Sequence, residues 1–291
     1  MIYLNGTFMP IEEARVPVLD RGFIFGDGVY EVIPVYSRRP FRLAEHLRRL
    51  QHSLDGIRLA NPHSSAEWEA VLTDLIARNE GEDQYLYLHI TRGVAKRDHA
   101  FPSPPVPPTV FAMSTPLPTP APELLQNGIG AVTVQDNRWL RCDIKAIALL
   151  PNVLLRQAAV DAGCAEAVLI RDGHGDEAPF LTEGAASNIF VVKNGALYAP
   201  PKDNLMLPGI TYDVLLELAA ANGIPCHVGR VTRDAVFAAD ELLLTSSTRE
   251  VLAITRLDGK PVGAGRPGPV FARLHQAYQA FKRDVMRAGH N

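Results

Sequence analysis

The stretch of sequence that decides the fold is Trp139-Leu-Arg-Cys-Asp-Ile-Lys145-Ala-Ile-Ala-Leu-Leu150, a mainly apolar run with one lysine near its centre. A helix start at Pro151-Asn152 follows it directly. Burial of this run would disfavour the ammonium form of Lys145, and a lysine with a lowered pKa is a nucleophile toward aldehydes. Taken alone, such a lysine more often extends its charge to the surface or pairs with a carboxylate, here Asp143. The rest of the sequence must decide between these interpretations.

The composition narrows the class of protein. The chain has 291 residues, of which 47% are hydrophobic, enough to build two domains. There are 29 Lys and Arg against 32 Asp and Glu, so the net charge is −3. Binding of nucleic acid or of a membrane surface would require a basic excess. We therefore predict small-molecule partners, with no nucleic acid and no membrane.

The cysteines and the N-terminus suggest the compartment. Cys142, Cys164 and Cys226 are odd in number, widely spaced and without a CxxC pair, so neither a disulfide framework nor a cysteine zinc site is expected. No metal site is predicted. The first eight residues lack the features of a signal peptide, and no apolar run is long enough to span a bilayer. A soluble, cytoplasmic protein is the expectation.

The N-terminal part contains a sheet and two helices. Asn5-Gly6, between strands at 2–4 and 7–9, is a strong signal for a type I′ hairpin. Leucines recur at helical spacing over 43–55, so this segment is predicted to be an amphipathic helix that ends with Gly56 as its cap. The other predicted elements of this part are strands at 29–36 and 85–91 and a helix near 65–79.

A proline-rich segment separates this part from the next. Prolines crowd residues 101–122, with a short apolar run at 110–113, and such density favours a stiff connector. We place the boundary near 116–123, which gives domains 1–118 and 119–291. The second domain is predicted to have strands at 130–135, 165–171, 188–193, 196–199, 241–246 and 251–257 and helices at 152–162, 210–221 and 268–287. Without a regular βαβ rhythm, this order predicts an α+β fold with largely antiparallel sheets.

Several well-known motifs are absent. The sequence has no P-loop, no HExxH, no GxSxG and no GxGxxG after a strand. His46 and His52 share a predicted helix, but a spacing of six residues does not place them on one face as metal ligands. Nucleotide-binding, zinc-protease and hydrolase functions therefore lose their main support.

Five motifs together resemble one enzyme family. They are Arg21-Gly-Phe-Ile-Phe-Gly-Asp-Gly-Val-Tyr-Glu31, Glu45-His-Leu-Arg-Arg49-Leu, Arg138-Trp-Leu-Arg-Cys-Asp-Ile-Lys145, Thr182-Glu-Gly-Ala-Ala-Ser-Asn188 and Leu207-Pro-Gly-Ile-Thr211. In this order, over nearly the whole chain, they resemble the class IV (fold type IV) aminotransferases, which depend on pyridoxal 5′-phosphate (PLP), and most of all those specific for D-amino acids. The resemblance implies the two-domain fold type IV and a homodimer that acts on small amino acids and 2-oxo acids.

The resemblance also assigns the catalytic residues. Lys145 would hold PLP as a Schiff base and then move the proton between the substrate α-carbon and the cofactor C4′. Glu183 would sit against the pyridine nitrogen and keep it protonated, although such a carboxylate at a strand end also serves simply to hydrogen-bond its own loop.

The cofactor phosphate requires donors, and the resemblance places them at three points. Ile210 and Thr211 open a predicted helix after Pro208, so their backbone N–H groups suit an anion. Ser246 and Ser247 would add hydroxyls, and Arg49 would reach the phosphate from its helix, unless it simply lies on a solvated helix face. Leu207 resembles the apolar residue that packs against the ring, which core packing would equally explain.

Three further residues indicate the substrate. Arg97 and His99 form an Arg-x-His pair that, with Tyr30, resembles the trap for the substrate α-carboxylate in D-amino-acid aminotransferases. Arg97 can bind a carboxylate through two hydrogen bonds, and His99 and Tyr30 can add one each. Fixing the carboxylate on that side would present the D hand of the α-carbon to Lys145.

Other functions on the same fold remain open. Branched-chain aminotransferases, which take L-amino acids, typically carry an Asn-Tyr pair a few residues after the lysine, where this chain has Leu149-Leu150-Pro151. The Asn-Arg type of sequence of aminodeoxychorismate lyases is also missing there. Ala185-Ala186 and Pro208 depart from the common pattern, so the substrate range is less well defined than the family. A non-catalytic PLP-binding protein is the alternative from another class.

Overall fold

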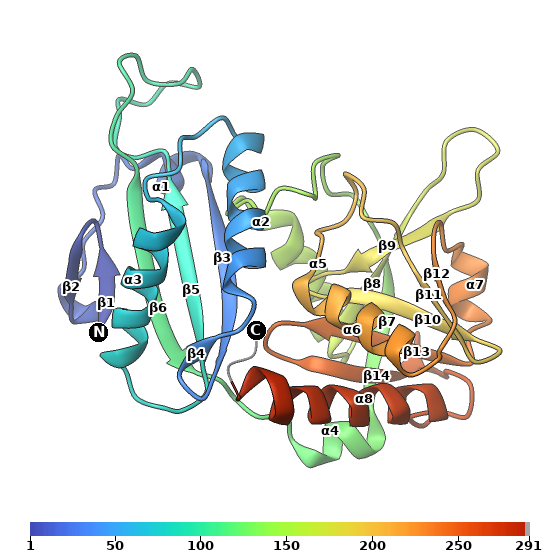
Figure 1. Ribbon diagram of the computed structural model, residues 1–291. Coiled ribbons are helices and arrows are strands. Elements are labelled where there is room, and N and C mark those ends of the chain that lie inside the picture. The colour runs from blue at the N-terminus through green and yellow to red at the C-terminus, as the bar shows by residue number, and fades with distance from the viewer. Residues whose placement is uncertain (289–291) are drawn as a thin grey trace. The chain divides into compact units, whose positions relative to one another are not determined.

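The computed structural model describes residues 1–288, and the chain forms two compact units (Figure 1). Unit 1 contains Met1–Pro118, and the chain returns to it at Ile144–Leu149 and at the described residues from Val285 on. Unit 2 contains Thr119–Asp143 and Leu150–Asp284. The prediction of two uninterrupted domains, 1–118 and 119–291, did not include these returns. Lys145 therefore belongs to the unit built by the N-terminal half of the chain.

Unit 1 is built on a six-stranded sheet in which every neighbouring pair of strands is antiparallel. Its spatial order is β2-β1-β6-β5-β3-β4. The strands are β1 (Ile2–Leu4), β2 (Thr7–Met9), β3 (Gly28–Tyr36), β4 (Arg39–Pro40), β5 (Gln84–Thr91) and β6 (Thr109–Pro116). The predicted hairpin at Asn5-Gly6 is confirmed, because both residues have the positive φ (48° and 93°) that a type I′ turn requires.

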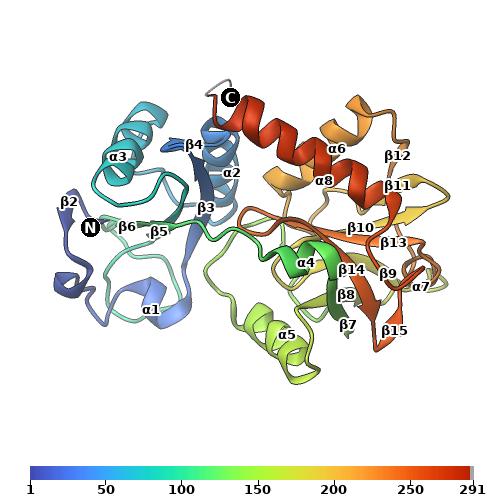
Figure 2. The same ribbon diagram turned by 90° about the horizontal axis from the view of Figure 1, so that it is seen from below.

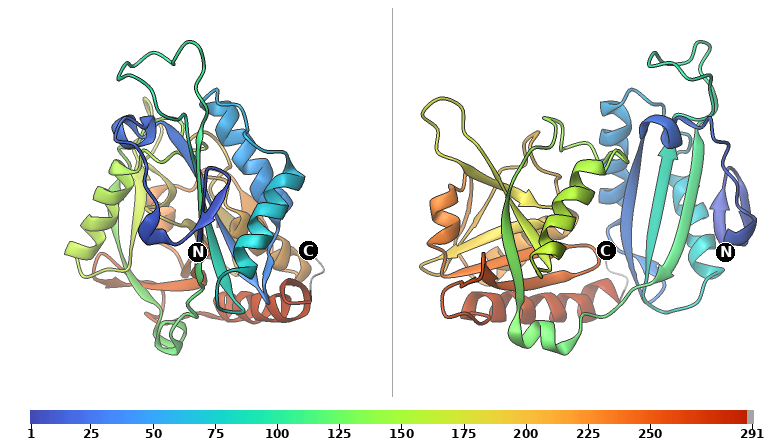
Figure 3. Two further views of the ribbon diagram at one scale, coloured as in Figure 1. Left: turned by 90° about the vertical axis from the view of Figure 1, so that its left-hand side faces the viewer. Right: turned by 180° about the vertical axis from the view of Figure 1, so that it is seen from behind.

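Two helices, α2 (Leu43–Gly56) and α3 (Ser65–Ala77), cover one side of this sheet, as the left view of Figure 3 shows. Leucines of α2 and the fully buried Trp68 of α3 pack against alternate residues of β3 and β5. A capping box between Ser64 and Glu67 begins α3. Residues on the opposite face of β3, Tyr30 among them, are left for other contacts.

The predicted glycine cap of α2 is wrong. Gly56 is part of the helix, and the next residue, Ile57, has φ −100°. The left-handed residue is instead Arg58, with φ 55°, whose N–H donates to the Asp55 carbonyl at 2.9 Å. The helix end is closed there by backbone hydrogen bonds, so no glycine is required at that point. A short helix that the pattern did not predict, α1 (Arg21–Phe25), begins at Asp20, whose carboxylate accepts from Gly22 N–H at 2.8 Å.

Unit 2 contains a nine-stranded sheet in the order β12-β11-β10-β13-β14-β7-β8-β9, with β15 also paired to β14. The strands are β7 (Ile129–Gln135), β8 (Glu166–Arg171), β9 (Phe180–Gly184), β10 (Asn188–Lys193), β11 (Ala196–Ala199), β12 (Cys226–Val228), β13 (Glu241–Ser246), β14 (Glu250–Leu257) and β15 (Lys260–Pro261). Three pairings, β11–β12, β14–β7 and β7–β8, are parallel. The expected α+β class is confirmed, but the larger sheet is mixed, and β9 and β12 were not predicted.

The helices of unit 2 pack on this sheet in separate groups (Figure 2). The first, α5 (Leu150–Asp161), packs against β7 and β8, whereas α6 (Ile210–Ala221) and α8 (Pro269–Phe281) pack against each other and against β13 and β14. The predicted helix at 268–287 changes to a π-helical turn at Lys282–Met286. Two short helices, α4 (Pro122–Asn127) and α7 (Arg233–Phe237), complete the unit. None of the helices in residues 1–288 combines the length and the apolar character of a membrane span.

Candidate active site

Lys145 lies on a segment that adds to the edge of β3. Ala146 forms an isolated antiparallel bridge with Val29, and the Tyr30 N–H donates to the Lys145 carbonyl at 3.0 Å. On the other side of the peptide, the Lys145 N–H donates to Ser53 Oγ of α2 at 3.0 Å. The backbone of Lys145 is therefore fixed by both the sheet and a helix of unit 1.

The side chain of Lys145 reaches over Tyr30. Its Nζ lies 4.1 Å from the centroid of the Tyr30 ring, within the range of a cation–π contact. Both side chains are half-buried, so the full burial expected from the apolar run is not found. Asp143, the alternative partner for the lysine, contacts Arg141 at 3.2 Å.

A buried ion pair lies next to this lysine. Glu31 is fully buried and accepts from both Nε and Nη2 of Arg49 at 2.7 Å and from His46 Nδ1 at 2.9 Å. Burial alone would raise the pKa of Glu31, but the charge and hydrogen bonds of Arg49 hold it well below its ordinary value. Burial lowers the pKa of His46, against the effect of Glu31. Arg49, predicted to bind a phosphate, thus has a carboxylate partner that sequence reasoning missed.

Arg97 and His99 lie on the exposed loop that follows β5. Both contact Phe25 of α1: the Arg97 guanidinium carbon is 5.5 Å and the His99 ring 5.4 Å from the centroid of its ring. Buried Arg21 fixes the loop by donating to the carbonyl oxygens of Asp98 at 2.6 Å, Ala100 at 3.2 Å and His99 at 3.4 Å. Within residues 1–288, no hydrogen bond or ring contact joins Arg97 or His99 to Tyr30.

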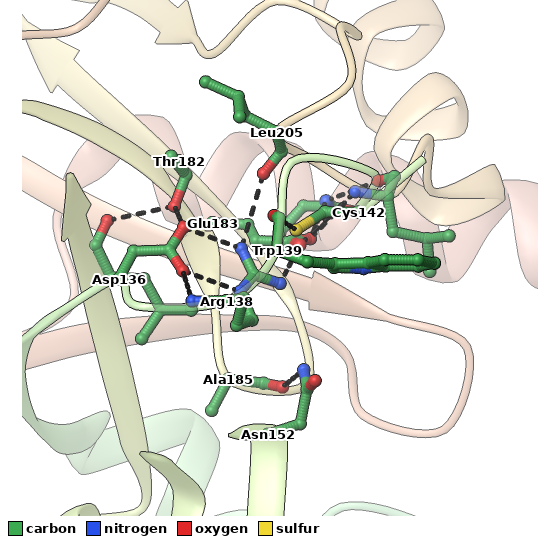
Figure 4. Close-up of polar contacts among 12 residues, drawn as sticks. Asp136, Arg138, Trp139, Cys142, Asn152, Thr182, Glu183, Ala185 and Leu205 are labelled. Carbon is green, nitrogen blue, oxygen red and sulfur yellow. Dashed lines mark hydrogen bonds and ion pairs between the residues drawn. The ribbon is translucent and has the colours of Figure 1, made fainter. Parts of the chain in front are cut away.

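Glu183 is the centre of a largely buried polar cluster in unit 2 (Figure 4), which we call the carboxylate cluster: Asp136, Arg138, Arg171, Thr182, Glu183 and Asn188. Its Oε1 accepts from Arg138 Nη1 at 2.5 Å. Its Oε2 accepts from Asn188 Nδ2 at 3.3 Å, and the Leu207 N–H lies 3.3 Å from both oxygens. Glu183 thus does not bond merely its own loop, the simpler role considered above.

Burial governs the proton affinity of Glu183. Only 5% of the residue is exposed, and this loss of water raises its pKa to about 7 even though Arg138 acts in the opposite direction. Burial would lower the pKa of Arg138, but its hydrogen bond to Asp136 and the charge of Glu183 raise it. The Asp136 carboxylate, buried but bound by Arg138, has a lowered pKa. Glu183 is thus the group of this cluster that titrates near neutral pH.

The start of α6 offers donors to an anion. Gly209 is the N-cap and has no side chain to cap the helix, so the buried first residues Ile210 and Thr211 present their N–H groups without a side-chain acceptor. A Cβ at Gly209 would lie 2.0 Å from Asn188 Oδ1, so only glycine allows this approach. The same asparagine donates to the Leu207 carbonyl at 3.0 Å, which ties the helix start to the carboxylate cluster.

The turn between β13 and β14 carries the predicted serines. Ser246 and Ser247 are half-buried, and Ser246 Oγ accepts from the Arg249 N–H at 3.1 Å. Arg249 also forms an ion pair with buried Glu166 of β8. Next to the turn, the buried Thr245 hydroxyl has no hydrogen-bond partner among residues 1–288. The turn is thus anchored at one end and has polar capacity at the other.

The predicted residues therefore fall into groups. Tyr30, Arg49 and Lys145 lie together in unit 1, while Arg97 and His99 share a separate loop. In unit 2, Glu183, Leu207, Ile210 and Thr211 are linked through Asn188, and Ser246 and Ser247 occupy one turn. Sequence reasoning missed Glu31, His46, Asp136 and Arg138. A signal existed for Glu31, because a strand's alternation places it on the same face as the apolar Val29 and Ile33.

Comparison with known proteins identifies the family. The model of the family "Amino-transferase class IV" matches residues 28–257. The chain belongs to this family, and the prediction of an aminotransferase is confirmed.

Curated relatives are similar over nearly the full length. The chain is 41% identical over 278 residues to a D-alanine aminotransferase of Bacillus licheniformis, covering 96% of this chain and 95% of the relative. It is 39% identical over 280 residues to a D-alanine aminotransferase of Staphylococcus aureus (strain MSSA476), covering 96% and 97%.

Solved structures of branched-chain aminotransferases have the same fold. One from Escherichia coli has a TM-score of 0.85 and 29% identity, covering 96% of this chain and 92% of that one. One from the organism abbreviated T.th., with pyridoxamine 5′-phosphate, has a TM-score of 0.88 and 29% identity, covering 99% and 95%. The predicted fold type IV is confirmed by these likenesses.

Proposed function

We propose that this chain transfers the amino group between D-amino acids, of the D-alanine and D-glutamate type, and 2-oxo acids such as 2-oxoglutarate and pyruvate. The reaction is ping-pong and depends on PLP. The observation that carries the proposal is the 41% identity to a D-alanine aminotransferase over 96% of the chain, together with a lysine fixed by its backbone beside Tyr30.

The residues present fit the cofactor. The buried Glu183 carboxylate keeps Oε2 in only long hydrogen bonds, which suits a ring N–H as a further donor. The uncapped start of α6 suits a phosphate, as does the unpartnered Thr245 hydroxyl at the turn with Ser246 and Ser247. A Cβ at Gly209 would fill space at this helix start.

Lys145 and Glu183 have the central roles. When bound, the cofactor supplies an aldehyde that joins the amine and a ring that accepts electrons from the substrate α-carbon. Lys145 Nζ holds the aldehyde carbon and, once released by the substrate amine, moves the proton between the α-carbon and the cofactor C4′. Glu183 holds the proton on the pyridine nitrogen, and Leu207 packs against the ring.

The phosphate is bound mainly by backbone N–H groups of Ile210 and Thr211 and by the hydroxyls of Ser246 and Ser247. Arg49 adds its guanidinium. Because Glu31 already balances the charge of Arg49, we assign this arginine a directional role and expect a smaller gain in affinity than an unbalanced arginine would give.

The substrate α-carboxylate is bound by Tyr30, Arg97 and His99. Tyr30 supports this role because its ring already contacts the Lys145 ammonium group. Arg97 and His99 support it because their loop is held by three carbonyl contacts to Arg21 and both side chains are exposed. A carboxylate held by an arginine fork has a fixed orientation, and that is what selection of the D enantiomer requires.

The second candidate is an L-branched-chain aminotransferase, favoured by the fold likeness to such enzymes at TM-scores of 0.85 and 0.88. The identity to those proteins is 29%, against 41% for the D-alanine aminotransferase. Fold likeness alone does not select a substrate, so the D-amino-acid assignment has the stronger support.

The test compares enantiomers with the purified protein and PLP. D-alanine with 2-oxoglutarate should give pyruvate and D-glutamate, and D-alanine alone should change the absorbance of the bound cofactor in a single turnover. L-alanine and L-leucine should do neither at the same concentration. Turnover of L-leucine alone would establish the second candidate, and pyruvate release without an oxo-acid acceptor, from a β-eliminating lyase, would overturn transamination. A protein that binds no PLP would overturn both.

We further propose a homodimer in a reducing compartment, the cytoplasm. Unit 1 exposes large apolar side chains such as Val18 and Phe23 (71% and 76% exposed), and unit 2 exposes Leu150 and Leu154 (69% and 62%). Such side chains are expected to be covered by a second copy. All three cysteines are free. Light scattering on the eluted protein should give twice the chain mass of 31.8 kDa, and a single-chain mass would refute the dimer.

A further inference from the structure

Arg138 has the geometry of a residue that controls Glu183, although no role has been assigned to it above. It is 7% exposed, and its guanidinium is shared by two buried carboxylates. Nε and Nη2 donate to the two oxygens of Asp136 at 2.9 and 3.0 Å, while Nη1 donates to Glu183 Oε1 at 2.5 Å. A charge-assisted bond of that length is much stronger than the contacts near 3.3 Å made by the other donors to Glu183.

Arg138 itself is held rigidly. Its backbone N–H donates to Asp136 Oδ1 at 3.1 Å, and Nη2 also reaches the Leu205 carbonyl at 3.4 Å. Asp136 is in turn held by the Thr182 hydroxyl at 2.7 Å and by Arg171 at 3.1 Å. The fork of Arg138 therefore has one orientation, as Figure 4 shows, and that orientation fixes the carboxylate plane of Glu183.

The two oxygens of Glu183 are consequently not equivalent. Oε1 is occupied by Arg138, whereas Oε2 has only the amide of Asn188 and a shared contact with the Leu207 N–H. A strong additional donor is best accepted at Oε2. Because Asp136 also binds Arg138, the guanidinium only partly offsets the burial of Glu183, whose pKa stays at about 7.

We propose that Arg138 is a positioning residue that reserves Oε2 of Glu183 for the N–H of the cofactor's pyridine ring and keeps that carboxylate ionised when the ring is bound. This inference rests on the proposed PLP dependence. Without Arg138 the buried carboxyl group would retain its proton and present either oxygen, so the ring nitrogen would lose its proton and its capacity to accept electrons.

The variant Arg138→Gln tests the proposal, with Arg141→Gln as the control. Arg141 lies three residues away and pairs with Asp143 at the surface. In Arg138→Gln, kcat for D-alanine should fall about 10- to 100-fold, as for other residues that orient a catalytic group, with KM changed by less than about 3-fold. The nitrogen NMR shift of bound 15N-labelled PLP should move toward that of the unprotonated ring. Arg141→Gln should leave both unchanged.

Two further measurements separate positioning from simple loss of structure. In a Glu183→Gln background, Arg138→Gln should add less than about 3-fold to the loss in kcat, because the carboxylate on which it acts is gone. Arg138→Lys, which keeps the charge, should recover part of the ring protonation. Fully additive losses, or a protonated ring in Arg138→Gln, would overturn the proposal.

A measurement on the cofactor-free protein distinguishes this failure from failure of PLP dependence. Carbon NMR of 13C-labelled glutamate should show the Glu183 carboxyl titrating at higher pH in Arg138→Gln than in the wild type. An unchanged titration would refute the control of Glu183 by Arg138, whatever cofactor the protein uses. Absence of bound PLP in the wild type would instead refute the proposed function.

Discussion

Lys145 and Tyr30 are joined twice: the Tyr30 N–H donates to the Lys145 carbonyl at 3.0 Å, and the Lys145 ammonium nitrogen lies 4.1 Å from the centre of the Tyr30 ring. The backbone bond fixes where the lysine begins, and the ring contact fixes where its amine ends. A residue proposed to bind cofactor and one proposed to bind substrate are thereby placed in direct contact.

Replacing Lys145 with alanine should abolish covalent attachment of PLP. Borohydride reduction followed by peptide mass spectrometry should locate the cofactor on the Lys145 peptide of the wild type and nowhere in the variant. Activity should fall by at least about 10³-fold, because both the nucleophile and the proton carrier are lost. Lys260→Ala, on the exposed strand β15, is the control and should remain labelled at Lys145. Labelling of another lysine in the wild type would refute the assignment.

Tyr30→Phe should separate the ring contact from the hydroxyl. The phenyl ring preserves the contact with Lys145, so the absorbance of bound cofactor should be unchanged. Loss of one hydrogen bond to the substrate carboxylate should raise KM for D-alanine about 10-fold, which corresponds to about 1.4 kcal/mol. Steady-state kinetics measure this directly. An unchanged KM with a shifted absorbance band would assign the hydroxyl to the cofactor instead.

Arg21→Gln should weaken substrate binding without touching the substrate. Arg21 donates to three carbonyl groups of the loop that carries Arg97 and His99, so its loss frees that loop. KM for D-alanine should rise several-fold, and limited proteolysis should cut the loop faster. Arg78→Gln, which breaks only a surface pair with Asp74, is the control. Faster proteolysis with unchanged KM would argue against the carboxylate-binding role of the loop.

Glu183 and Glu31 should give opposite dependences of stability on pH in the cofactor-free protein. The pKa of Glu183 is raised from 4.5 to about 7, so the folded state binds its proton more tightly and the contribution to stability is lost as pH rises through about 7. That contribution is about 3 kcal/mol. The pKa of Glu31 is lowered, so its contribution is present above its ordinary value and is lost as pH falls below it.

Urea unfolding of the wild type, Glu183→Gln and Glu31→Gln at several pH values measures these differences. Relative to the wild type, Glu183→Gln should become more stable as pH rises from 5 to 8. Glu31→Gln should be destabilised by about 3–5 kcal/mol at neutral pH, because Arg49 is left buried without its carboxylate. A constant difference between Glu183→Gln and the wild type across this range would contradict the raised pKa.

Gly209→Ala should disturb the start of α6. The added Cβ would lie 2.0 Å from Asn188 Oδ1, so the asparagine or the helix start must move, at a cost of about 1–3 kcal/mol. The affinity for PLP should fall more than the affinity for unphosphorylated pyridoxal, since the displaced N–H groups are those proposed for the phosphate. Gly229→Ala, where a Cβ meets nothing within 4 Å, is the control. Equal losses for both cofactors would place the phosphate elsewhere.

The sequence by itself determined the family, the catalytic lysine and the main elements, because these depend on local patterns. Asn5-Gly6 requires a hairpin whatever surrounds it, and leucines at helical spacing require a helix with one apolar face. The order of five short motifs was enough to identify an aminotransferase. The glycine cap at Gly56 failed because a helix end is also set by the backbone bonds available to the next residues.

Only the tertiary structure decided which charged groups face each other. Glu31 and Arg49 are eighteen residues apart and Arg138 and Glu183 forty-five, and no local pattern relates such positions. It also decided that Lys145 belongs to the N-terminal unit, since its segment returns to the edge of β3. The physical reason is that a buried charge requires a partner, and the folded backbone alone determines which one is within reach.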